Sequence, residues 1–190
     1  MVVALLAGCS QPGPQAIPIK AADSYAAKAQ SDGLAAGAEP FDTYFKSTNA
    51  LGKNVSREFT PVQLVVESAV PDKFLLHRDG AKLICADGTA LEPVSAIKMF
   101  HHYQEPLNVP VLVGFGLGRP ALIANDSNER TMADWMNKEF PSVAVLKTGG
   151  RVGGLLYFRG TCPLRMGRRL HVTADKMTSS DAVSLSLELR

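Results

Sequence analysis

Pro61-Val62-Gln63-Leu64-Val65-Val66-Glu67 is the stretch that decides the fold. Val62, Leu64 and Val66 alternate with Gln63, Val65 and Glu67, which is the period of a strand with one buried face. We therefore predict that a sheet begins at Pro61.

Two Asp-Gly pairs follow this strand and divide the next apolar runs. Asp79-Gly80 lies between residues 74–77 and 82–86, and Asp87-Gly88 follows the second run. Asp-Gly is a strong hairpin signal because both turn positions tolerate positive φ. These turns predict successive antiparallel hairpins, which a strand over 96–103 extends.

The C-terminal third repeats the strand pattern. Apolar runs over 143–146 and 151–159 are joined by Thr148-Gly149-Gly150, and two more strands are predicted over 171–174 and 182–189. In the last strand, apolar residues alternate strictly with serine and glutamate, which predicts one buried face. Those residues are Val183, Leu185, Leu187 and Leu189.

Helical patterns occupy two places. Over 126–140, Asp126 and Glu129 have the spacing of a capping box, and Pro141 ends the pattern. The apolar stripe of this helix consists of Met132, Trp135, Met136 and Phe140. A short helical lead-in is predicted from Pro40, with Phe41, Tyr44 and Phe45 on one face that packs on the domain.

Short strands separated by turns, with one connecting helix, predict a mainly β fold over 40–190. The expected architecture is an antiparallel immunoglobulin-like β-sandwich with the helical lead-in at its start. Three segments resemble bacterial lipoproteins with an immunoglobulin-like domain: 60–66, 135–140 and 146–158. That resemblance implies the fold and an envelope compartment, and it brings no catalytic residues.

The beginning of the chain, Leu5-Leu6-Ala7-Gly8-Cys9-Ser10, resembles a lipobox, where a lipoprotein signal peptide is cut and the new terminal cysteine is acylated. Residues 1–8 are then part of a signal peptide whose basic n-region we expect upstream. Ser10 in place of aspartate implies sorting to the outer membrane, with palmitate among the acyl groups on Cys9. The alternative is an N-terminal strand that happens to contain a cysteine.

Residues 9–39 are predicted to form a flexible tether. Prolines and glycine in the segment that follows Cys9 disfavour regular hydrogen bonding, and 20–38 is rich in alanine, serine and glycine. Acyl chains on Cys9 would hold the chain to a bilayer, since each buried methylene contributes about 0.8 kcal/mol.

Composition argues against nucleic acid as a partner. The chain has 20 basic and 18 acidic residues, a net charge of +2, and no basic run longer than Arg168-Arg169. Nucleic-acid binding requires a basic stripe. A hydrophobic fraction of 46% is that of a globular protein.

Two cysteines remain once Cys9 is assigned to lipid. Cys85 and Cys162 would lie in an oxidising compartment, where thiol pairs tend to form disulfides. The alternative is that both are small buried apolar residues. Spacing alone does not decide between the two.

The sequence predicts no catalytic residue, no metal site and no cofactor. It contains no Cys-x-x-Cys, no His-Glu-x-x-His and no Gly-x-Ser-x-Gly. His101 and His102 would point to opposite faces of a strand and so could not share an ion.

Two segments are candidates for contact with a partner. Residues 109–123 are apolar and glycine-rich but too short to span a bilayer, and they are expected to form an edge strand, a loop or a flap. Arg165, Arg168 and Arg169 form a basic loop near Cys162, which is either solvated or binds lipid phosphates or an acidic partner.

The leading hypothesis is a lipid-anchored, non-enzymatic envelope protein on the periplasmic face of the outer membrane, with a structural or accessory role beside an envelope protein partner. The alternative is a periplasmic ligand-binding module with a mobile flap at 109–123.

Overall fold

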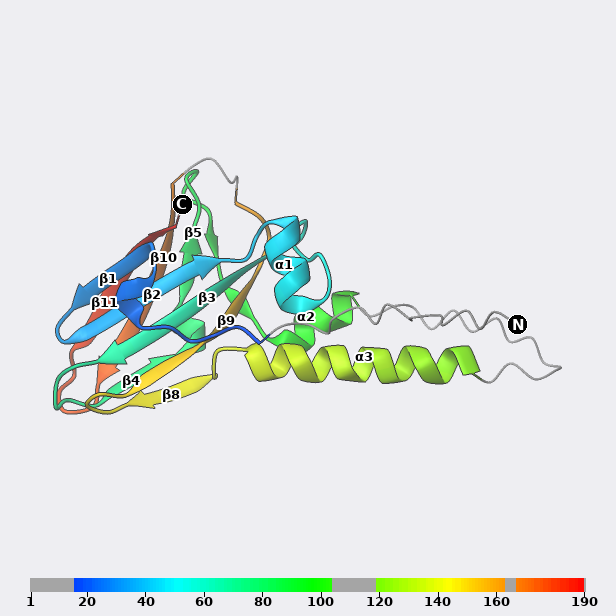
Figure 1. The fold of residues 1–190 in the computed structure, drawn as a ribbon. Helices are drawn as coiled ribbons and strands as arrows, with labels where there is room; N and C mark the ends of the chain where they lie inside the picture. Colours follow the sequence, from blue (N-terminus) through cyan, green and yellow to red (C-terminus); the bar gives the residue numbers. More distant parts are fainter. Residues whose placement is uncertain (1–15, 104–118, 163–166, 190) are drawn as a thin grey trace, which may run out of the picture.

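A computed structural model describes residues 16–103, 119–162 and 167–189, with the backbone alone for 119–126 (Figure 1). The described chain is mainly β, and every pairing between its strands is antiparallel. Three α-helices lie together on one side of the strands (Figure 1).

The first sheet has the order β1-β2-β3-β9-β7. Its strands are β1 (Ala27–Ser31), β2 (Leu34–Pro40), β3 (Phe59–Ser68), β9 (Arg151–Arg159) and β7 (Pro93–Val94). The decisive stretch lies in β3, the middle strand, which pairs with β2 on one side and β9 on the other.

The second sheet has the order β6-β5-β10-β4-β8, and β11 also pairs with β10. Its strands are β6 (Ala90–Leu91), β5 (Lys82–Ile84), β10 (Arg168–Lys176), β4 (Phe74–His77), β8 (Val143–Leu146) and β11 (Ala182–Leu189). β5 and β4 pair with the same edge of β10 at different positions along it, β5 with residues 169–171 and β4 with residues 174–176.

A main core fills the space between the two sheets. Val62, Leu64 and Val66 of β3 belong to it together with Leu170 and Val172 of β10. Burial in β11 alternates residue by residue, with all four predicted apolar residues inside. Each such side chain contributes about 1.5–3 kcal/mol when removed from water.

The helices form a second core on the outer face of the first sheet. β9 serves both cores, because Leu156 and Phe158 face the main core while Leu155 and Tyr157 face the helices. β3 is likewise buried along almost its whole length. The prediction of one buried face for β3 was therefore wrong, since helices and the N-terminal segment cover the other face.

The predicted tether over 9–39 is wrong in its second half. β1 and β2 form a hairpin within the first sheet, so the folded domain starts well before residue 40. The turn is Asp32-Gly33, where both residues have positive φ (47° and 80°). The small side chains of Ala36 and Ala38 are buried in the main core, so an alanine-rich composition here fills a close-packed sheet.

The lead-in helix begins later than predicted. α1 (Tyr44–Leu51) has Thr43 as its N-cap, with the hydroxyl accepting from the Lys46 N–H at 3.3 Å. Tyr44 and Phe45 are 58% and 74% exposed, so the expected packing of these two rings on the domain was wrong, whereas Phe41 packs against the second core as predicted. The buried positions are instead Ser47, Ala50 and Leu51.

Residues 96–103 form a helix, α2 (Ala96–Tyr103), and not the predicted strand. Ala96, Met99 and Phe100 are buried at helical spacing i, i+3 and i+4. The Ser95 hydroxyl accepts from the Lys98 N–H at 3.3 Å, as an N-cap does. Over so short a run, a different set of apolar residues can be fitted to each period, so periodicity alone did not decide between them.

α3 (Arg119–Lys138) begins seven residues before the predicted start. Pro120 is compatible with this because proline is tolerated in the first turn of a helix. Asp126 lies within the helix, so the expected capping box is absent. Trp135 is fully buried and Met132 half-buried, as the stripe predicted, whereas Met136 is 44% exposed.

The two Asp-Gly turns differ in outcome. Asp87-Gly88 joins the antiparallel pair β5–β6, as predicted. Asp79-Gly80 does not close a hairpin, because β4 and β5 do not pair with each other and each pairs instead with β10. Thr148-Gly149-Gly150 joins β8 to β9 as a turn, but those strands belong to different sheets.

Candidate functional site: the face where the chain enters the domain

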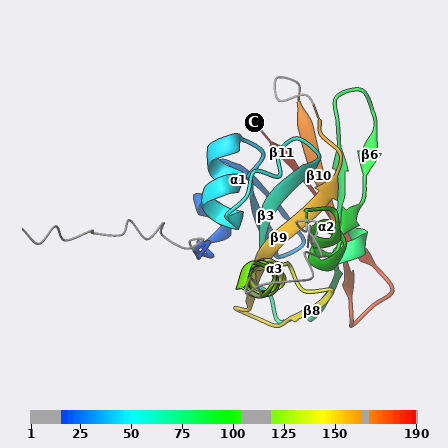
Figure 2. The same cartoon turned by 90° about the vertical axis from the view of Figure 1, so that its right-hand side faces the viewer.

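The described chain enters the domain beside α1 and α3 (Figures 1 and 2). Ile17 packs against the helical core, and the carbonyl of Pro18 accepts from Gln63 Nε2 at 3.0 Å. Gln63 is 3% exposed and is the polar member of an otherwise apolar run in β3. Its buried amide thus holds the entering segment on the sheet from Pro18 onward.

Cys9 lies outside the described residues. It lies seven positions before Ala16, so an extended chain would place it at most about 25 Å from the domain. If Cys9 were attached to a surface, this face of the domain would therefore stay close to that surface.

A pocket of about 350 Å³ lies between the entering segment, β3, β9 and α3. Its walls include Ile17, Ile19, Gln63, Asp134 and Lys138. The Lys138 ammonium contacts Asp134 Oδ2 and the carbonyl of Ala50, both at 2.7 Å. These polar groups join α3 to α1, so the charge of the lysine is compensated within the wall.

Two glycines of β9 form the floor of this pocket. A Cβ on Gly154 would lie 2.6 Å from the backbone of Phe140, because the chain after α3 crosses β9 there. The Phe140 N–H donates to the carbonyl of Leu155 at 2.8 Å at the same crossing. Gly154 is therefore required by the close approach of two backbones.

An exposed aromatic pair lies near the entrance. The rings of Tyr44 and Phe45 at the start of α1 meet edge-to-face with centroids 5.5 Å apart. Both views show α1 beside the entering segment (Figures 1 and 2). The two rings form a small exposed apolar group on this helix.

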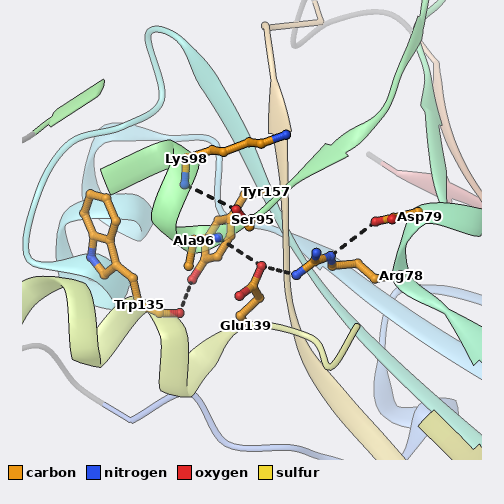
Figure 3. A network of polar contacts seen from close by, with 8 residues as sticks. All are labelled: Arg78, Asp79, Ser95, Ala96, Lys98, Trp135, Glu139 and Tyr157. Carbon is orange, nitrogen blue, oxygen red and sulfur yellow. Dashed lines mark hydrogen bonds and ion pairs between the residues drawn. The ribbon is translucent and has the colours of Figure 1, made fainter. Parts of the chain in front are cut away.

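A polar network lies deeper, where α2 begins and where α3 and β4 end (Figure 3). One carboxylate oxygen of Glu139 accepts from the Ala96 N–H at 2.9 Å and forms an ion pair with Arg78 Nη1. Arg78 Nε also lies 3.5 Å from Asp79. Burial raises the pKa of Glu139, while the Ala96 N–H and the Arg78 charge oppose that rise.

Tyr157 completes the network from β9. Its hydroxyl donates to the carbonyl of Trp135 at 2.9 Å, and burial raises the pKa of this phenol well above its ordinary value. Trp135 Nε1 in turn donates to the carbonyl of Leu51 at 2.8 Å. These two hydrogen bonds join α1, α3 and β9. Tyr157 and Trp135 therefore have a structural role.

Cys85 and Cys162 are joined by a disulfide, with Cα atoms 5.4 Å apart. Cys85 follows β5 of the second sheet and Cys162 follows β9 of the first, so the bond links the two sheets. Both residues are buried in the main core. Of the two readings that the sequence left open, the structure has the bonded one.

The three arginines do not form one basic surface. Arg165 lies outside the described residues. Arg168 is buried in β10, where it forms an ion pair with Asp42, while Arg169 points to the exposed face. The expectation failed because this segment is a strand, in which neighbouring side chains alternate between faces.

The four histidines are divided among β4, α2 and β10. In the described segments, no three His, Cys, Asp or Glu side chains are close enough to hold one metal ion. His102 lies on α2 and contacts Glu58, and its ring meets Phe59 with centroids 5.6 Å apart. His101 and His102 are thus on a helix and not on the strand that the sequence predicted.

Sequence reasoning missed Gln63, Asp42 and Glu139. Gln63 carried a usable signal, since a polar residue on the covered strand of a sheet must find a partner. Asp42 and Glu139 carried none, because their partners lie 126 and 61 residues away.

Part of the expected flap is helical. Residues 119–123 belong to the backbone of α3, whereas 109–118 lie outside the described residues. Within the described part of the chain, no helix is both long and apolar enough to cross a membrane.

No family model and no curated protein matches the chain. Among solved structures, it is similar to the yjhA protein from Bacillus subtilis, with 10% sequence identity over 78% of each chain and a TM-score of 0.40. A similarity this distant supports no argument about function.

Proposed function

We propose that this chain is a lipid-anchored protein on the periplasmic face of the bacterial outer membrane, with a non-enzymatic structural or accessory role. The observation that carries the proposal is the sequence Leu5-Leu6-Ala7-Gly8-Cys9-Ser10, which places an acceptor cysteine after two small residues. Acyl chains on Cys9 would be the membrane contact, and an envelope protein would be the partner of the domain.

The entrance geometry supports this role. The folded domain begins within about 25 Å of Cys9, so a tether of this length would hold α1 near the bilayer surface. Tyr44 and Phe45 are exposed on that helix. Aromatic side chains suit the membrane interface because they present an apolar body with, in tyrosine, a polar tip.

The disulfide supports export from the cytoplasm. Disulfides persist in oxidising compartments such as the periplasm and are rare in the cytosol of mesophiles. A buried Cys85–Cys162 bond that links two sheets suits a secreted domain.

The two antiparallel sheets around one core are compatible with an immunoglobulin-like sandwich, and we propose that class for the domain. β1 at the edge of the first sheet lies against β11 of the second, so the sheets approach each other on that side. The helices cover the outer face of the first sheet (Figure 2).

The test is acylation of Cys9 in a Gram-negative host, using the full chain behind a lipoprotein n-region. We expect palmitate labelling, partition into detergent, and a mass increase that Cys9→Ser abolishes. Ser10→Asp is the matched control, because it should leave acylation intact and move the protein to the inner membrane. An uncleaved and unmodified N-terminus in the soluble fraction would overturn the proposal.

The pocket beside the entering segment favours a second candidate, a ligand-binding module. Its volume of about 350 Å³ lies at the lower end of the range of roughly 300–1,000 Å³ for small-molecule sites. Thermal-shift screening with metals, lipids and peptidoglycan fragments tests it. A stabilising ligand should lose its effect in Asn137→Phe, which would fill the pocket, and no shift with any probe would remove this candidate.

A further inference from the structure

β8 is an edge strand of the second sheet. It pairs with β4 on one side, and it lies at the boundary of the molecule in two perpendicular views (Figures 1 and 2). Val143 and Val145 are each 50% exposed there.

The hydrogen bonds of β8 show which of its backbone groups are free. The Arg78 N–H donates to the carbonyl of Ser142 at 3.0 Å, next to the ladder that pairs β4 with β8. Because the bonding direction alternates along an antiparallel strand, Ser142, Ala144 and Leu146 point toward β4. The N–H and C=O groups of Val143 and Val145 therefore point outward, and no described residue bonds to them.

The other described edges carry features that discourage pairing. β1 bears the exposed Lys28 and lies against β11. β7 begins at Pro93, and β6 is two residues long. Charged residues, proline and short length all protect an edge from adding another strand. β8 has no charged residue and no proline within its four residues, Val-Ala-Val-Leu, and it is twice as long as β6.

We propose that β8 pairs antiparallel with β8 of a second copy of this chain, with the two Ala144 residues facing each other. This register places Val143 opposite Val145 of the second copy and Val145 opposite its Val143. Both members of each pair have outward backbone groups, so each pair exchanges two hydrogen bonds. The second sheets of the two copies would then form one continuous sheet.

Charge and apolar contact agree with this register. Lys147 faces Pro141 of the second copy, so no like charges are opposed. The exposed valines lie side by side across the junction, and cross-strand pairs of β-branched residues stabilise a sheet.

The contact is small, so we expect weak association in solution. Stable interfaces bury about 1,200–2,000 Å², more than a four-residue strand provides. Confinement to a membrane raises the effective concentration of two copies. In this respect the inference rests on the proposed function, while the register is a property of the domain alone.

The experiment is disulfide trapping in solution with two variants of the full chain, Val143→Cys and Val145→Cys, each in a Cys9→Ser background. In the proposed register, the Cα atoms of Val143 in one copy and Val145 in the other lie about 5.5 Å apart, within disulfide reach. The same residue in the two copies lies diagonally across the junction, about 7–8 Å apart. We expect a mixture of the two variants at high concentration to form crosslinked dimer several-fold faster than either alone. Equal rates in all three samples, or no excess over an exposed Met177→Cys control, would overturn the proposal.

A charge placed on the edge provides the second readout. Val145→Lys, added to the Val143→Cys chain, should abolish crosslinking to the Val145→Cys chain, whereas Met177→Lys should leave it unchanged. Urea unfolding midpoints establish that both lysine variants are folded. Because Cys9 is absent throughout, failure of this pairing is separate from failure of lipid anchoring, which palmitate labelling measures.

Discussion

Arg168 and Asp42 form an ion pair in which both side chains are buried, with 2% and 8% exposed. Arg168 begins β10 of the second sheet, and Asp42 lies in the link between β2 and α1. The pair therefore joins the two sheets at the end where the link leaves the first of them. Arg168, which the sequence suggested as a partner-binding residue, instead forms a buried ion pair within the domain.

Asp42→Ala should destabilise the protein strongly. It leaves the Arg168 guanidinium buried without its carboxylate, and breaking a buried pair from one side costs about 3–5 kcal/mol. Urea unfolding followed by Trp135 fluorescence measures the loss. The exposed pair Lys46–Glu39 provides the control, because Glu39→Ala should change stability by about 0–1 kcal/mol. Equal effects of the two substitutions would contradict this assignment.

Removal of the disulfide should weaken the link between the sheets. Cys85 and Cys162 are 77 residues apart, and opening a loop of this size should lower the free energy of unfolding by about 2–5 kcal/mol. The double variant Cys85→Ala/Cys162→Ala and urea unfolding with or without reductant measure this. Cys9→Ser is the control and should leave the free energy unchanged. A stability insensitive to reductant would show that the bond does not form.

Gly154→Ala should disturb the crossing between β9 and the chain after α3. The added Cβ would meet the Phe140 backbone at 2.6 Å, and overpacking of this kind costs about 1–3 kcal/mol. Gly167→Ala is the matched control, because no atom of the described residues lies within 4 Å of its Cβ position. Thermal unfolding of both variants checks the difference, and similar melting temperatures would contradict the close approach.

Most of the predicted strands are present, including β9, which is covered on both faces. The burial of individual residues follows the prediction where a strand has a strict period of two and one covered face. β11 is the clearest case, because its four apolar residues are buried and its polar residues exposed. β10 and the β5–β6 turn follow the same local rules. In these places, local pattern and tertiary environment agree.

Errors arose where distant segments decide the outcome. Asp79-Gly80 has the chemistry of a hairpin turn, but β10, about ninety residues later, takes the place of the partner strand. Asp32-Gly33 is the same signal and does close a hairpin, although the alanine-rich context indicated a tether. For residues 96–103, burial against Trp135 and the first sheet selects the helix over the strand.

The candidate site was predictable only in its attachment point. Cys9 follows from the sequence and remains a prediction, while the pocket, the aromatic pair and the Glu139 network depend on contacts between segments far apart. Arg168 is an example, because nothing in its neighbouring sequence indicated that it would be buried and paired with Asp42.

Glu139 should make stability depend on pH. Burial raises its pKa above the ordinary 4.5, so the native state holds this proton more tightly than the unfolded chain does. The resulting stabilisation is complete below pH 4.5 and is lost as the pH rises through the raised value. Glu139→Gln cannot titrate and should flatten this part of the profile. Urea unfolding at a series of pH values, with carboxyl NMR titration of Glu139, checks the expectation, and parallel profiles for variant and parent would contradict it.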